Sequence, residues 1–246
     1  MIRAAVLTAI YDDYDTLKPV LPQDGADVEW ICVTDSRKLA EEAALVARPV
    51  IEPDAYYVTA PLVHPTGWEI RYQPRPDLHP NRAAKLPKVR PGHYTSRAAS
   101  VWLDASFRVT SPRLVVDTLT YASEYGGGIA QFRHPWRDCL YDEAVTSIGL
   151  PKYAGEADRI DRQWRAYREA GMPYNWGLWA CGVIARAHRA DVLRWGDAWG
   201  DEIEQHSYQD QVSHPYSLWR AGLRPADLPG NHLGNQWLSY EGSGRH

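Results

Sequence analysis

The sequence lacks the features that define several common classes of protein. Its three cysteines, Cys32, Cys139 and Cys181, are far apart and include no Cys-x-x-Cys pair, so neither a disulfide framework nor a zinc knuckle is indicated and buried thiols are expected. No apolar run approaches the roughly 18 residues of a membrane helix, and the first residues do not form a signal peptide. These absences predict a cytoplasmic protein without membrane contact.

Motifs for familiar chemistries are also missing. There is no Gly-x-x-x-x-Gly-Lys-Ser/Thr loop, no Gly-x-Ser-x-Gly elbow and no His-Glu-x-x-His helix, and "YGGGIAQF" precedes a predicted strand rather than a helix. The net charge of −4, without a basic run, argues against tight sequence-independent binding to a polyanion. Phenylalanine occurs only twice, whereas the 11 Trp and 15 Tyr residues carry polar groups. Such rings suit a sugar-binding cleft and core packing equally well.

The hydrophobic pattern that is present predicts an α/β fold. A short apolar run at 2–9 precedes the acidic, tyrosine-rich "IYDDYD", a second run at 28–35 ends on Thr34 and Asp35, and a helical segment follows at 36–46. Further strands are predicted at 99–107, from 129 to about Phe132, and at 178–185, with helices at 111–125, 155–171, 188–203 and 207–222. This alternation predicts one domain, 1–246, with a mostly parallel central sheet whose carboxyl ends collect the ligand site.

The segments between these elements are less regular. Residues 49–80 and the tail after 222 show no clean period and are predicted to be loops. In "NRAAKLPKVRPGHY", one or two helical turns place Arg82 and Lys85 on one face before Pro87 stops or kinks the helix. In the helix at 111–125, Ser111 is the expected cap.

Asp104 ends the apolar run "SVWLDASF". A carboxylate at the end of a strand can ligate a divalent cation that holds a diphosphate, which is what sugar transfer from a nucleotide sugar requires. An Asp-x-Ser triplet after a strand is also a common turn. Both readings stay open from the residues alone.

Seven segments together resemble a glycosyltransferase-like domain family of plants and bacteria, whose plant members include a mucilage glycosyltransferase and a turgor-regulation protein. They occur in the family's order: "LTAIYDDYDTL", "VTD", "NRAAKLPKVRPGHY", "SVWLDASF", "FRHPWRDCLYDEA", "GLWACGVIARAH" and "YQDQVSHPYSLW". That family is similar to the family 8 glycosyltransferases, so the resemblance implies a GT-A fold, a nucleotide-sugar donor, most often a UDP-sugar, and retention of anomeric configuration.

The resemblance also implies roles for individual residues. The loop from Thr8 to Tyr14, which includes Ala9 and Tyr11, is expected to hold the nucleoside together with Asp35. Arg82 and Lys85 are expected at the diphosphate or donor sugar, and His134, Arg137 and Glu143 are expected to line the donor or acceptor pocket. Asp210 and Gln211 resemble an Asp-Gln pair under the transferred sugar, where a carboxylate steadies positive charge.

The implied cofactor is Mn²⁺ or Mg²⁺, held by Asp104 and by His232 of "NHLGNQW". Ser106 replaces the second acid of the family 8 Asp-x-Asp motif, and a hydroxyl is a poorer ligand than a carboxylate. Gln236 stands where that family has a lysine.

Each of these roles has an ordinary alternative. Asp210 can simply begin a helix, His232 can be a packed tail residue, and His134, Arg137 and Glu143 can form surface salt bridges. For the whole chain, two other functions stay open: a nucleotide-sugar-binding protein that has lost turnover, and a lipid amide hydrolase, for which no nucleophile triad or zinc cluster is found. The sequence does not identify the acceptor, which can be a polysaccharide, a protein, a small molecule or a modified DNA base.

Overall fold

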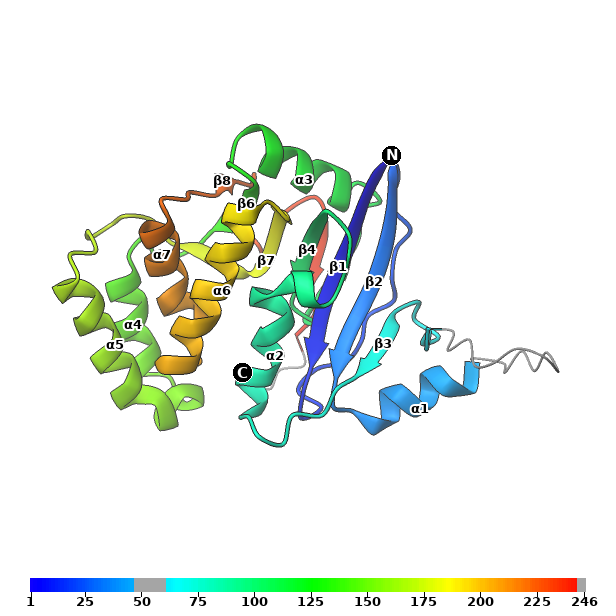
Figure 1. Cartoon of the computed structure of the whole chain (residues 1–246), viewed down its shortest axis with the longest axis horizontal. Helices are drawn as coiled ribbons and strands as arrows, with labels where there is room; N and C mark the ends of the chain where they lie inside the picture. The colour runs from blue at the N-terminus through cyan, green and yellow to red at the C-terminus, as the bar shows by residue number, and fades with distance from the viewer. Residues whose placement is uncertain (47–60, 243–246) are drawn as a thin grey trace.

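A mixed seven-stranded sheet forms the centre of the computed structural model, which describes residues 1–46 and 61–242 (Figure 1). The strand order is β3-β2-β1-β4-β7-β6-β8. The strands are β1 (Ile2–Ile10), β2 (Ala26–Thr34), β3 (Glu69–Tyr72), β4 (Ala99–Leu103), β6 (Ile129–Arg133), β7 (Trp179–Ala187) and β8 (Ala226–Asp227). Strands β3, β2, β1 and β4 are parallel, and β7 is antiparallel to both neighbours. The predicted α/β fold with a mostly parallel sheet is confirmed.

The apolar run of β1 is continuous because both of its faces are buried. Ala4 and Val6 pack in one core cluster, and Ala5 and Leu7 pack in another. The first cluster includes the apolar side of α3 (Leu114–Glu124), and the second includes α2 (Pro80–Val89) and α6 (Ala190–Gln205). Helices therefore cover the sheet on both faces, as a GT-A-like fold requires.

The remaining helices lie at the two ends of the sheet (Figure 1). One group, α4 (Leu140–Ile148), α5 (Ala157–Glu169) and α7 (Asp210–Ala221), packs around its own apolar cluster. Helix α1 (Arg37–Val46) lies at the opposite end, next to β3. A second sheet pairs β5 (Phe107–Val109) with β9 (Leu238–Tyr240), which fixes the tail beside the residues that follow Asp104.

Five details differ from the sequence prediction. Strand β3 lies in the segment predicted to be loop, of which residues 49–60 fall outside the described residues. Helix α4 occupies a segment predicted only to be polar, and the tail contains β8 and β9. Helix α2 continues through Pro87 to Val89 instead of stopping there. Helix α3 begins at Leu114, although Ser111 does accept a hydrogen bond from the backbone of Arg113.

Two sequence predictions concern the cysteines and membrane-spanning helices. The three cysteines are free and buried, as expected. Within residues 1–46 and 61–242, no helix combines the length and the apolar character that crossing a bilayer demands.

Candidate functional site

A pocket of about 510 Å³ opens beside the carboxyl end of β4. Its walls come from α2, the residues after β4, the loop after β6, β7, the start of α7 and the tail. A smaller hollow of about 150 Å³ adjoins it at the end of β1 and shares Lys85, Lys88, Asp104 and Ser106 with it. The ligand site predicted at the ends of the strands therefore coincides with a cavity.

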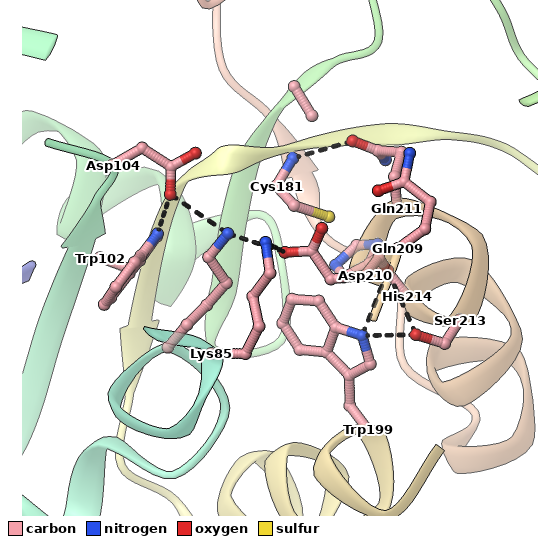
Figure 2. Close-up of polar contacts among 12 residues, drawn as sticks. Lys85, Trp102, Asp104, Cys181, Trp199, Gln209, Asp210, Gln211, Ser213 and His214 are labelled. Carbon is pink, nitrogen blue, oxygen red and sulfur yellow. Dashed lines mark hydrogen bonds and ion pairs between the residues drawn. The ribbon is translucent and has the colours of Figure 1, made fainter. Parts of the chain in front are cut away.

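Asp104 is held in place by contacts of its side chain (Figure 2) and by a hydrogen bond of its backbone. Its Oδ1 accepts hydrogen bonds from Trp102 Nε1 at 2.7 Å and lies 3.1 Å from Lys88 Nζ. Its backbone N–H donates to the carbonyl of Gly182 at 2.9 Å. A Cβ on Gly182 would lie 2.9 Å from the ring of Phe107 and 3.2 Å from Asp104 Oδ2, so glycine leaves the room that this carboxylate needs. The Asp-x-Ser triplet does form a turn, in which the backbone N–H of Phe107 donates to the carbonyl of Asp104 at 3.0 Å, and the Asp104 side chain makes its contacts from that turn.

Lys88 is the buried cation at the base of the pocket. Its ammonium lies between two carboxylates, 3.1 Å from Asp104 and 2.8 Å from Asp210, and only 2% of its side chain is exposed. Burial opposes the charged form, but the carboxylates of Asp104 and Asp210 outweigh it and raise the pKa of Lys88. Arg186, itself buried, donates to the backbone carbonyl of Lys88. Lys88 therefore carries a fixed positive charge that links α2 to the end of β4 and to the start of α7.

Asp210 is the first residue of α7 and binds two lysines (Figure 2). Its Oδ2 lies 2.9 Å from Lys85 Nζ and 2.8 Å from Lys88 Nζ. Burial favours protonation, but the two ammonium groups dominate and hold the pKa of Asp210 below its usual range. The start of a helix also favours negative charge. This carboxylate is ionised at neutral pH and faces the pocket.

Gln211 lines the same pocket but is already bonded to β7. Its Oε1 accepts from the backbone N–H of Cys181 at 3.2 Å, and its Nε2 donates to the carbonyl of Trp179. The amide therefore ties the start of α7 to the strand, which fixes the position of Asp210.

The residues predicted to contact the nucleoside separate into two groups. Ala9 and Tyr11 line the smaller hollow, and the Tyr11 hydroxyl donates to Gln73 O at 2.8 Å. Thr8 is buried within the sheet and lines neither hollow. Asp35 also lies outside both, and its Oδ1 accepts from the backbone of Asp12 at 3.0 Å. Asp35 shapes the loop after β1 rather than the wall of the hollow.

Arg82 is not brought into the pocket. It donates to the carbonyls of Ile203 and of His206, the latter at 2.8 Å, and it lies 3.5 Å from Glu156. These contacts place it on the side of α2 that faces the connection from α6 to α7. On this helix the cation that joins Lys85 at the pocket is Lys88.

His134, Arg137 and Glu143 lie together in the pocket wall. Arg137 Nε lies 2.6 Å from Glu143 Oε2, and only 6% of the Glu143 side chain is exposed, so this is a buried contact rather than a surface salt bridge. Burial, with smaller effects of Arg137 and His232, lowers the pKa of His134 to about 4. His134 is therefore neutral at neutral pH.

The residues expected to hold a metal do not form a complete ligand set. Asp104, Ser106 and His232 line one pocket, and His232 Nδ1 is buried without a hydrogen-bond partner. Within the described part of the chain, however, no three His, Cys, Asp or Glu side chains are grouped so as to hold an ion. The Oδ1 of Asp104 also already faces the Lys88 ammonium. Binding of Mn²⁺ or Mg²⁺ stays a prediction. The donor groups of Asp104, Ser106 and His232 do not fit such an ion.

Tyr14, at the end of the loop predicted to hold the nucleoside, lines both hollows. The structure adds pocket residues that the sequence reading did not select: Asn81, Lys88, Trp136, Lys152, Tyr153 and Gln209. A signal for Lys88 was present, because Lys85 and Lys88 are three residues apart and share a helix face if the helix continues through Pro87.

The depressed pKa of Asp210 predicts a loss of stability in acid. Its interactions with Lys85 and Lys88 stabilise the fold fully above the ordinary value of 3.8 and are lost as the pH falls through the lower folded value. We expect Asp210→Asn to be less stable than wild type near neutral pH, with a difference that narrows below about pH 4. Urea unfolding at several pH values measures it. A difference that stays constant down to about pH 2 would contradict this account of Asp210.

Comparison with known families gives one match. A family model described as "TOD1/MUCI70, glycosyltransferase-like domain" matches residues 68–227. That range includes Lys85, Lys88, Asp104 and Asp210, and it ends before His232. A comparison with curated proteins found no match.

Proposed function

This chain belongs to the TOD1/MUCI70 glycosyltransferase-like domain family, and we propose that it is an enzyme with a single such domain. In this proposal the enzyme transfers a sugar from a nucleotide sugar to a hydroxyl or related group of an acceptor. A UDP-sugar is the first candidate for the donor. Retention of anomeric configuration is part of the proposal.

The observation that supports this proposal most is the charged network across the base of the pocket. Two lysines of α2 meet two carboxylates, Asp104 after β4 and Asp210 at the start of α7. Paired ammonium groups suit a diphosphate, and an ionised carboxylate suits a sugar carbon that gains positive charge. The smaller hollow at the end of β1 offers Ala9 and Tyr11 to the nucleoside.

The proposed reaction breaks the bond between C1 of the sugar and the β-phosphate oxygen, and the electron pair leaves with the diphosphate. The acceptor oxygen forms the new bond to C1, and its proton passes to the departing diphosphate. Lys85, 23% exposed, can donate to the leaving group. Asp210 remains ionised and stabilises C1 as the old bond lengthens.

The two alternatives receive less support. A binding protein without turnover would have the same pocket. Release of nucleoside diphosphate from the nucleotide sugar distinguishes the two, because only an enzyme produces it. An amide hydrolase needs an activated nucleophile or a metal centre. The described residues contain no metal-binding cluster, and burial raises the pKa of the Cys181 thiol in this pocket, which makes it a poor nucleophile.

Nucleotide binding tests the proposal directly. We expect calorimetric titration with UDP, GDP, CDP, ADP and dTDP, in buffer with Mn²⁺, to show binding of at least one. Lys85→Met should weaken that binding by about tenfold or more, because a charge-assisted hydrogen bond is lost. Lys38→Met is the control, since the Lys38 side chain is 79% exposed on α1. Absence of binding by all five nucleotides would reject a donor site.

A further inference from the structure

Three lysines line one pocket, and they differ in how they are neutralised. Lys85 and Lys88 both contact Asp210, and Lys88 also contacts Asp104. Lys152, in the short 3₁₀ helix Pro151–Glu156, has no carboxylate within 4 Å among residues 1–46 and 61–242. Its ammonium lies 5.0 Å from the centre of the Tyr153 ring. Among the described residues, Lys152 is therefore the pocket lysine that no carboxylate contacts directly.

The other charges in the wall leave a place for an anion near Lys152. The charged side chains that line the pocket are four cations, Lys85, Lys88, Arg137 and Lys152, and three carboxylates, Asp104, Glu143 and Asp210. Each carboxylate already contacts a cation of the pocket, Glu143 through Arg137. Partial burial, and then the charge of Lys85, lower the pKa of Lys152, while the carboxylates of the pocket, none of them in direct contact with it, act in the opposite direction. An anion between Lys85 and Lys152 would relieve that repulsion.

The position of Lys88 bears on the cofactor. Its ammonium lies 3.1 Å from the Asp104 oxygen that Trp102 also binds. A divalent cation ligated at this oxygen would meet a fixed positive charge, and the described residues supply no group of three ligands to compensate. Lys88 already neutralises the two carboxylates that would otherwise repel a diphosphate.

We propose that the pocket binds the diphosphate of its substrate through Lys85 and Lys152 without a divalent cation, and that the Lys88 ammonium takes the place of that cation. This inference rests on the proposed function, because the diphosphate is that of the nucleotide-sugar donor. It differs from the metal-assisted mechanism that the family 8 resemblance implies. The charge that stabilises the leaving group then comes from lysines fixed by the fold.

The test uses the full chain and the nucleoside diphosphate that binds in the titrations above. Its affinity is measured by calorimetry after dialysis against EDTA, and again with excess Mn²⁺ or Mg²⁺. We expect binding in EDTA that either metal improves by no more than about twofold. Lys152→Met should weaken binding in EDTA by about tenfold or more, whereas Lys38→Met should not change it.

The outcomes separate this inference from the function on which it rests. Binding that is seen only with Mn²⁺ or Mg²⁺ would overturn the metal-free site and leave the donor site standing. Unchanged affinity in Lys152→Met would overturn the role of Lys152 in phosphate binding. No binding under any condition would reject the donor site itself. Lys152 is suited to substitution because its residue is exposed and lies outside the core clusters.

Discussion

Lys88→Met is expected to lower the free energy of unfolding by about 3–5 kcal/mol, the cost of breaking a buried ion pair by removing one partner. Methionine can fill the path of the lysine chain, but it leaves Asp210, with a side chain 7% exposed, bound to Lys85 alone. Urea unfolding near neutral pH measures the change. Lys38→Met is the matched control, because its ammonium is exposed and 4.0 Å from Glu42, a contact worth about 0–1 kcal/mol.

A second variant separates lost charge pairing from lost packing. In Lys88→Met/Asp210→Asn the buried carboxylate of Asp210 is gone as well, so the charge that remains beside the methionine is that of Asp104, whose side chain is 39% exposed. We expect the double variant to lose less stability than the two single variants together, because the residues contact each other. Strictly additive losses, or a loss below about 1 kcal/mol in Lys88→Met, would show that this pair is not central to the fold.

The sheet was predictable because its strands are buried on both faces. Such strands appear in a sequence as short continuous apolar runs, and polar residues directly follow the runs at β1, β2 and β4. Strand β3 has four residues, of which only Ile70 is buried, so it gives no such run. Its place at the edge of the sheet is set by pairing with β2, a tertiary contact that local sequence does not encode.

The pocket was predictable in part. Asp104 was selected because it follows a strand, Lys85 because it lies on a helix face, and Asp210 because its segment resembles the Asp-Gln pair of the family 8 enzymes. Lys88 was missed because Pro87 indicated the end of that helix, whereas α2 continues to Val89. At 100° per residue, Arg82 and Lys88 lie on either side of Lys85, which explains why Arg82 turns towards Ile203 and Lys88 towards Asp104.

Residues contributed by the fold alone could not be read from local patterns. Lys152 comes from a segment far from the other lysines in sequence, and the packing of α4, α5 and α7 brings it to the pocket. Trp136, whose residue is 70% exposed, lies in the loop after β6. Neither has a sequence neighbour that indicates a ligand.

Asp210→Asn is expected to slow sugar transfer by roughly 10²–10³-fold while the nucleoside diphosphate binds about as tightly as to wild type, or more tightly. Asparagine keeps the shape of the side chain but removes the negative charge. In the ground state that charge is directed at Lys85 and Lys88, so its removal leaves more positive charge for the diphosphate. In the transition state the sugar carbon becomes positive, and the variant has no carboxylate to stabilise it.

The measurement compares release of nucleoside diphosphate from the nucleotide sugar with calorimetric affinity for the diphosphate in the same preparation. Asp161→Asn is the control, because Asp161 is an exposed acid on α5 that pairs with Arg165. A slow reaction with intact binding would place Asp210 at the reacting carbon. Equal losses of rate and affinity would mean that Asp210 only holds the two lysines in place. An unchanged rate would move the reacting centre elsewhere in the pocket, because Asp210 would then have no part in the step that breaks the sugar-phosphate bond.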